Sequence, residues 1–155
     1  TGIRNKTAYD SEIRLIEKKI LSGKKDFGIA MIDLNFLKTI NDSYGHECGN
    51  IAIKKLCSIV CNVFKHSPVF RIGGDEFVVI LERRDFNNAE NLVEKFNEKI
   101  QELKKDSSLK PWEKISAAIG LAFLDDNNKN IQYVFNCADK NMYEHKKQMK
   151  AERRK

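Results

Sequence analysis

The apolar run FGIAMI at residues 27–32 limits most strongly how this chain can fold. Six consecutive apolar or small residues leave neither side of an extended segment for water. The run therefore predicts an interior strand that is buried on both faces, with helices covering the sheet. Asp33 follows it directly. A carboxylate at the end of a buried strand is costly unless it has a charged or hydrogen-bonding partner.

Periodicity on either side of this run predicts the other elements. Apolar residues recur at helical spacing in residues 5–22, 47–65, 86–105 and 130–150, and a short helix is expected after Asp33. Further strands are predicted at residues 68–72, 77–81 and 115–124. The short glycine-containing gap between the first two of these predicts a β-hairpin. We expect one α/β (α+β) domain with a mixed central sheet and helices on its faces.

The net charge of +6 is concentrated near the C-terminus. Residues 146–155 hold six Lys or Arg and one Glu, so the other 145 residues carry about +1. We interpret residues 1–150 as the domain and residues 151–155 as a basic tail. The chain has no clustered aromatic platform or reading helix, which disfavours a nucleic-acid binder.

No apolar run approaches the roughly 20 residues of a membrane helix, and no cleavable signal opens the chain. We therefore expect no membrane contact by this domain and a cytoplasmic location, which is compatible with an anchor elsewhere in a full-length protein. The start at Thr1 suggests that an upstream segment precedes the domain.

The cysteines and histidines do not predict a zinc site. Cys57 and Cys61 are four residues apart and lack the C-x-x-C spacing. Without a secretory signal, all four cysteines are interpreted as free thiols that fill the core. The histidines at 46, 66 and 145 are scattered along the chain. Oxygen ligands are the remaining way to hold a metal.

The predicted hairpin contains Gly73, Gly74, Asp75 and Glu76. Adjacent glycines allow backbone dihedrals closed to other residues and let a substrate approach the backbone. If the hairpin lies beside the buried strand, Asp33 and Asp75 converge. Carboxylate oxygens suit Mg²⁺, with Mn²⁺ as an alternative, and such a pair suits metal-assisted phosphoryl transfer. By itself, the same turn is more typical of a solvent-exposed loop.

Residues 33–50 have a composition suited to a nucleotide. Backbone N–H groups in the turn after the buried strand, with the positive end of the short helix, can hold phosphates. A lysine supplies a compact positive charge, and two asparagines offer amide groups to a base edge. The candidate substrate-binding residues here are Phe36, Leu37, Lys38, Asn41 and Asn50.

Four motifs in the same order resemble those of the GGDEF family of diguanylate cyclases. The matching stretches are residues 1–6 (TGIRNK), 33–50 (DLNFLKTINDSYGHECGN), 71–77 (RIGGDEF) and 138–146 (ADKNMYEHK). The resemblance covers essentially the whole chain. It implies a ferredoxin-like fold similar to adenylyl cyclase and the polymerase palm, and a reaction in which two GTP condense to cyclic di-GMP and two pyrophosphates.

The same resemblance implies roles for individual residues. Asp33, Asp75 and the Leu34 carbonyl are similar in position to the Mg²⁺ ligands, and Glu76 to a residue that assists deprotonation of the 3′-hydroxyl. Lys38 and Lys146 match triphosphate contacts, and Lys150 keeps a positive charge near the phosphate end. Asn41 and Asn50 occupy the guanine-reading positions. One subunit holds one nucleotide, so the resemblance also implies a homodimer and an upstream sensor or dimerisation region.

The chain departs from the family pattern at three places. Asn50 stands where the family usually has Asp, and Met149 replaces a usual glycine. Phe64 and Ser67 occupy the positions of the inhibitory R-x-x-D motif, so no product-feedback site is expected. Two alternatives to an active cyclase for GTP remain: a catalytically silent GTP-binding regulatory module, and a cyclase with relaxed purine specificity.

Overall fold

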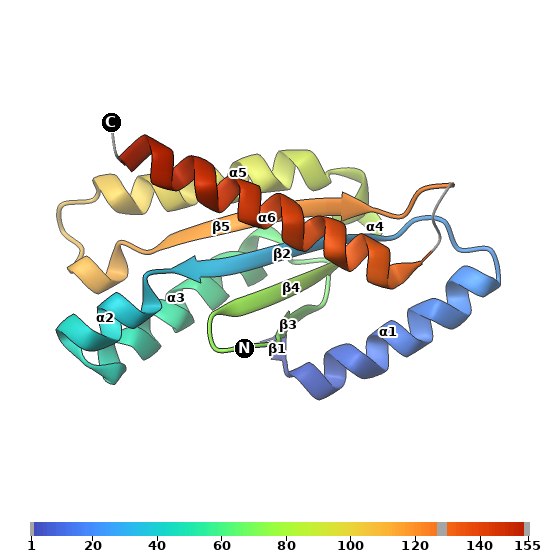
Figure 1. Ribbon diagram of the computed structural model, residues 1–155, viewed down its shortest axis with the longest axis horizontal. Coiled ribbons are helices and arrows are strands. Elements are labelled where there is room, and N and C mark those ends of the chain that lie inside the picture. Colours follow the sequence, from blue (N-terminus) through green and yellow to red (C-terminus); the bar gives the residue numbers. More distant parts are fainter. Residues whose placement is uncertain (1, 127–129, 154–155) are drawn as a thin grey trace.

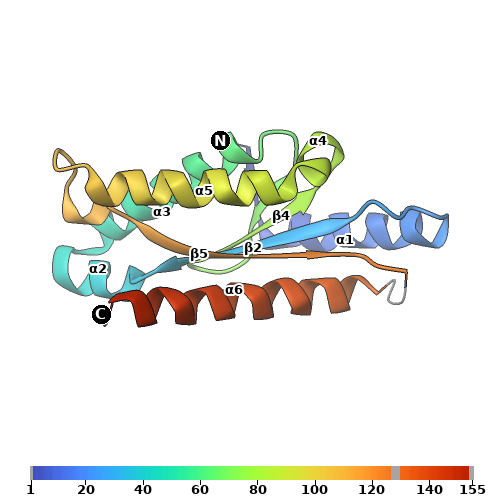
Figure 2. The same cartoon turned by 90° about the horizontal axis from the view of Figure 1, so that it is seen from above.

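A five-stranded mixed sheet forms the centre of the molecule, with helices on both faces, as predicted (Figures 1 and 2). The computed structural model describes residues 2–126 and 130–153. The strands are β1 (Ile3–Arg4), β2 (Gly28–Asn35), β3 (Val69–Arg71), β4 (Glu76–Leu81) and β5 (Ser116–Phe123). The helices are α1 (Lys6–Leu21), α2 (Leu37–Tyr44), α3 (His46–Val63), α4 (Arg83–Asn87), α5 (Ala89–Lys105), the 3-10 turn η1 (Pro111–Glu113) and α6 (Ile131–Arg153).

Strand β2 is the buried interior strand expected from the apolar run. The strand order is β1-β3-β4-β2-β5, and β2 pairs antiparallel with both β4 and β5. All eight of its residues are buried. The expected end at residue 32 is wrong, because Leu34 and Asn35 still pair with Ala117 and Ser116 of β5. Asp33 therefore lies inside the strand, with neighbours on both edges.

Alternation along β2 separates two apolar cores. Ala30 and Ile32 pack with residues of α3 and α5, whereas Ile29 and Met31 pack with residues of α1 and α6. Figure 2 shows α5 and α6 on opposite sides of the sheet. Because side chains alternate between the faces of a strand, Asp33 falls on the α6 side.

The predicted hairpin is present as β3 and β4, and β4 lies beside β2. Three short elements were not predicted: β1, which pairs parallel with β3, and the short helical segments α4 and η1. Two to five residues are too few to carry a recognisable period. The last helix continues to Arg153, three residues beyond its expected end. Thr1 of the opening motif and the last two residues of the basic tail lie outside the described residues.

The prediction of free thiols is confirmed, since no disulfide joins the cysteines at 48, 57, 61 and 137. All four are partly buried, and Cys57 packs against the apolar core on the α3 and α5 side of the sheet. Within residues 2–126 and 130–153, no helix is both long and apolar enough to cross a membrane.

Candidate functional site

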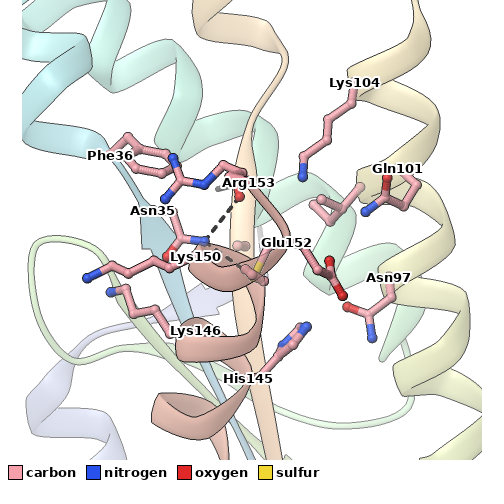
Figure 3. A pocket seen from close by; sticks show the side chains of 14 residues that line it. Asn35, Phe36, Asn97, Gln101, Lys104, His145, Lys146, Lys150, Glu152 and Arg153 are labelled. Carbon is pink, nitrogen blue, oxygen red and sulfur yellow. Dashed lines mark hydrogen bonds between the residues drawn. The ribbon is translucent and has the colours of Figure 1, made fainter. Parts of the chain in front are cut away.

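The C-terminal end of β2 opens beside a cavity of about 580 Å³ (Figure 3). Asn35 and Phe36 line it where β2 ends, and Lys146 and Lys150 reach the same side from α6. Two of the predicted phosphate contacts thus lie next to the predicted phosphate-binding turn.

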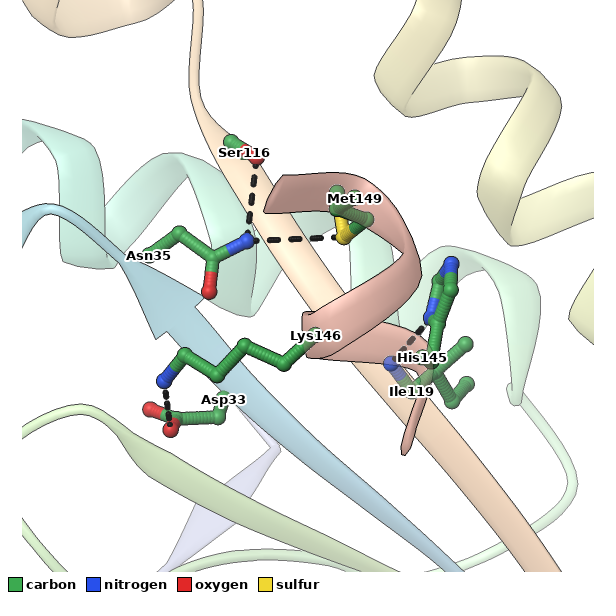
Figure 4. A network of polar contacts seen from close by, with 7 residues as sticks. All are labelled: Asp33, Asn35, Ser116, Ile119, His145, Lys146 and Met149. Carbon is green, nitrogen blue, oxygen red and sulfur yellow. Dashed lines mark hydrogen bonds and ion pairs between the residues drawn. The ribbon is translucent and has the colours of Figure 1, made fainter. Parts of the chain in front are cut away.

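Asp33 has the charged partner that its burial requires (Figure 4). Its side chain is largely buried, and Lys146 Nζ lies 2.6 Å from Oδ2. The other carboxylate oxygen, Oδ1, is buried and has no hydrogen-bond partner. Buried polar atoms in folded proteins are nearly always satisfied, so an unpartnered acceptor at this position points to a further ligand.

The hairpin brings two more carboxylates to Asp33. Leu34 N–H donates to the Asp75 carbonyl at 2.9 Å, and Glu76 lies directly opposite Asp33 in the β2–β4 register. Burial raises the pKa of Asp33; the Lys146 hydrogen bond opposes that rise and the nearby Asp75 carboxylate adds to it. Burial also raises the pKa of Glu76, with added repulsion from Asp33 and Asp75. The expected convergence of Asp33 and Asp75 is confirmed.

This carboxylate group fits a magnesium ion. Asp33 and Glu76 both interact with the ammonium of Lys146, and the nearby Asp75 and Asp139 add further negative charge. The N–H and C=O of one strand residue point to the same edge, so the Leu34 carbonyl also faces the hairpin. In the described part of the chain, no cluster of three or more His, Cys, Asp or Glu forms a metal cage. An ion held by few protein oxygens, with water and phosphate completing its shell, is typical of Mg²⁺.

The hairpin loop is held from outside by Arg71, to which the sequence assigned no role. Arg71 donates from Nη2 to the Gly74 carbonyl at 2.7 Å and from Nε to the Gly73 carbonyl at 3.3 Å. The expected dihedral reason for the glycines is wrong, because neither has a positive φ. A Cβ at Gly74 would meet nothing within 4 Å. The second reason, close approach of a ligand to bare backbone, stays a prediction for this glycine.

The turn between β2 and α2 has an unusual backbone. Phe36 precedes α2 with a φ of 66°, and no side chain caps the helix. Such a conformation is uncommon for a bulky residue. The side chain of Arg153 lies over the Phe36 ring, with Cζ 4.1 Å from the ring centre. Because no side chain caps α2, its first backbone N–H groups remain available, as the predicted phosphate-binding turn requires.

The proposed base-reading residues lie at the α2–α3 junction. A Cβ at Gly49 would collide with the Asn41 side chain, so this glycine makes room for the Asn41 amide. Lys38 and Asn50 are exposed. Among the described residues, no hydrogen bond or ion pair joins Lys38, Asn41 or Asn50 to the carboxylate group, so their roles stay predictions.

Asn35 is a buried polar residue that the sequence reasoning missed (Figure 4). Its Nδ2 donates to Ser116 Oγ at 3.1 Å and to Met149 Sδ at 3.6 Å, while Oδ1 is buried without a partner. Its place two residues after Asp33 was the available signal, because strand alternation puts both side chains on one face. Met149, where the family usually has glycine, makes one of these contacts.

The two positions of the inhibitory motif have structural roles here. Phe64 is fully buried in the core, and Ser67 Oγ donates to Asp85 Oδ2 at 2.8 Å. Asp85 is itself buried and also accepts from His66 N. Neither position offers an Arg–Asp pair to a ligand.

A family model described as diguanylate cyclase, GGDEF domain, matches residues 1–152. This chain belongs to the GGDEF domain family. The GGDEF domain of DgcB from Caulobacter crescentus, solved in complex with c-di-GMP, is 24% identical, with a TM-score of 0.78 and coverage of 92% of this chain and 85% of that one. The FimX GGDEF domain of Pseudomonas aeruginosa is 16% identical, with a TM-score of 0.79 and coverage of 96% and 91%. The predicted palm-like fold is thereby confirmed.

The curated relatives that this GGDEF domain matches are longer than the chain. Proteins of Staphylococcus aureus described as uncharacterized membrane proteins are 27% identical over 141 residues, which cover 90% of this chain and 40% of theirs. The chain thus spans about 40% of the length of these relatives.

Proposed function

We propose that this GGDEF domain is an active diguanylate cyclase that condenses two GTP into cyclic di-GMP and two pyrophosphates. The observation that carries the proposal is the group of Asp33, Asp75 and Glu76 beside Lys146, with the Asp33 Oδ1 atom buried and unpartnered. A catalytically inactive domain would have no need of this concentration of negative charge.

The reaction forms a bond between the 3′-oxygen of one GTP and the α-phosphorus of the other. The bond from that phosphorus to the pyrophosphate breaks, and the 3′-hydroxyl loses its proton. A second such step closes the ring. Mg²⁺, or Mn²⁺ in its place, would be held by Asp33, Asp75 and the Leu34 carbonyl and would neutralise phosphate charge when bound.

The chain's own residues bind, orient and accept the proton. The α2 N-terminal turn, Lys38 and Lys150 would hold the triphosphate. Lys146 would exchange its contact with Asp33 for a phosphate oxygen. Burial and neighbouring carboxylates raise the pKa of Glu76, which brings it nearer to the range of an effective general base for the 3′-hydroxyl.

Two copies of the domain are needed, because each holds one nucleotide and the two reacting nucleotides must face each other. A twofold dimer supplies that arrangement. The relatives are longer than this chain, which is compatible with an upstream region that brings two domains together or senses a signal.

The test is to fuse the domain to a dimeric coiled coil, incubate it with GTP and Mg²⁺, and separate the nucleotides by chromatography. Cyclic di-GMP is the expected product. GTP binding without any dinucleotide would instead identify the silent regulatory module.

The same assay with ATP as competitor addresses base selection, which rests on Asn50 in place of an acceptor-only Asp. One amide donor facing guanine N1–H costs about 1–3 kcal/mol if it stays mispaired. We expect GTP to remain preferred, and Asn50→Asp to discriminate more strongly against ATP. Equal discrimination by both proteins would contradict relaxed specificity.

A further inference from the structure

The cavity at the end of β2 continues away from the carboxylate group. It extends between α6 and α5, with Ser116 and Ala117 of β5 also in its lining (Figure 3). Its volume of about 580 Å³ lies within the roughly 300–1,000 Å³ of ordinary ligand sites. The part that lies against α5 contains none of the residues assigned above to the nucleotide.

The lining of this cavity carries an excess of positive charge. Lys104 comes from α5, and Lys146, Lys150 and Arg153 come from α6, against the single acid Glu152. Lys146 is paired with Asp33. Among the described residues, no ion pair joins Lys104 or Lys150 to a carboxylate. Cations gathered from two helices around one hollow repel one another and favour a multivalent anion between them.

The uncharged lining suits an extended polar ligand. Asn97 and Gln101 of α5 offer amide groups toward the cavity (Figure 3). His145 Nδ1 accepts from Ile119 N–H at 3.0 Å, so a neutral ring carries its proton on Nε2 and keeps a donor. The buried, unpartnered Oδ1 of Asn35 needs a donor instead. Water bound to a magnesium ion supplies such a donor, and phosphate chains commonly carry Mg²⁺.

We propose that the part of this cavity against α5 extends the phosphate site, with Lys104 of α5 as the outer contact for a linear phosphate chain of two or more units. Because the cations come from two helices, a chain of phosphates matches their arrangement better than a single phosphate does. This inference rests on the proposed function in one respect: the phosphates of a bound nucleotide would lie next to the cavity at Lys146 and Lys150. The phosphate chain could be free pyrophosphate or the lengthened phosphate tail of a nucleotide.

The test is isothermal titration of inorganic pyrophosphate and triphosphate, with Mg²⁺, into the wild-type domain, Lys104→Ala and Lys99→Ala. Lys99 is an exposed lysine of α5 outside the cavity lining, so its variant controls for loss of charge. We expect Lys104→Ala to weaken binding about three- to tenfold at low salt, with a smaller loss at high salt. Lys99→Ala should bind like the wild type.

Three results would overturn the proposal: no binding to the wild type, equal affinity of Lys104→Ala and the wild type, or an equal loss in Lys99→Ala. Repeating the titration with a saturating non-hydrolysable GTP analogue separates the two sources. If the GTP analogue leaves pyrophosphate binding undiminished, the subsite binds a separate anion. If the analogue competes with pyrophosphate, the subsite binds the phosphate tail of a nucleotide. Lys104-dependent binding in a domain that makes no dinucleotide would retain this subsite while refuting the cyclase proposal.

Discussion

Single side chains fix the shape of the hairpin loop that carries Asp75. The Asp75 carbonyl is tied to Leu34 on β2, and Arg71 ties the two preceding carbonyls. A planar guanidinium reaches both carbonyls at once, which a lysine ammonium on a flexible stem does less well. Asp75 can therefore face Asp33 without further reorganisation.

The first prediction concerns Arg71→Lys. Each lost hydrogen bond is worth about 0.5–1.5 kcal/mol, so we expect Mg²⁺-dependent affinity for GTP to fall by roughly two- to tenfold. The free energy of unfolding should change little, because Arg71 is exposed. Arg14→Lys, at an exposed position of α1, is the matched control. Unchanged affinity in Arg71→Lys would mean that the loop keeps its shape without this side chain.

At the scale of elements, helix α6 places its lysines by lying unusually close to β5. A Cβ at Gly120 would collide with backbone atoms of Ala138, Asn141 and Met142. This close approach lets Lys146 reach Asp33 and His145 reach the β5 backbone. The glycine therefore sets the distance between the helix and the site.

The second prediction is that Gly120→Ala lowers the free energy of unfolding by about 1–3 kcal/mol through overpacking. The loss should appear although alanine is otherwise favoured over glycine within a strand. Gly74→Ala, where the added methyl group meets open space, should leave stability nearly unchanged. Chemical denaturation of both variants measures this. A Gly120→Ala protein as stable as the wild type would mean that α6 shifts at no cost.

The third prediction concerns His145 and pH. Burial lowers the pKa of His145, so the unfolded chain, with an ordinary value of about 6.5, binds this proton more tightly. The neutral ring contributes its full stabilisation of the folded state above about pH 6.5, and this contribution declines as the pH falls below that value. The raised pKa values of Asp33 and Glu76 act in the opposite direction.

The His145 contribution is therefore isolated by comparison with His145→Gln. We expect the stability advantage of the wild type, measured by denaturation, to be largest near pH 8 and to narrow toward pH 5. An advantage that stays constant over this range would contradict a pH-sensitive His145 contact.

Sequence reasoning predicted the elements that have a long period or a long apolar run. It found β2, the four long helices and the hairpin, and it placed Asp33 near Asp75. It missed Arg71 and Asn35 as structural supports, because their contacts depend on a loop shape and on which side chains face α6. The close approach at Gly120 was also invisible, since nothing in the sequence gives the distance between helix and strand.

At the scale of the whole molecule, the C-terminal positive charge belongs to the site. Lys146 pairs with Asp33, Lys150 lines the cavity, and Arg153, in the range interpreted as a tail, is helical and lies over Phe36. The fold thus sets cations from the end of the chain against carboxylates from its middle. This arrangement suits a magnesium-bound triphosphate.

The measurement that tests the cyclase account most directly is cyclic di-GMP formation by the coiled-coil-fused domain carrying Asp75→Asn, in the presence of GTP and Mg²⁺. We expect turnover to fall by about 100-fold or more, with an unchanged fold by circular dichroism. Asp10→Asn, at an exposed carboxylate of α1 paired only with Lys6 among the described ion pairs, should keep wild-type turnover. An Asp75→Asn domain that forms cyclic di-GMP at the wild-type rate would contradict the account.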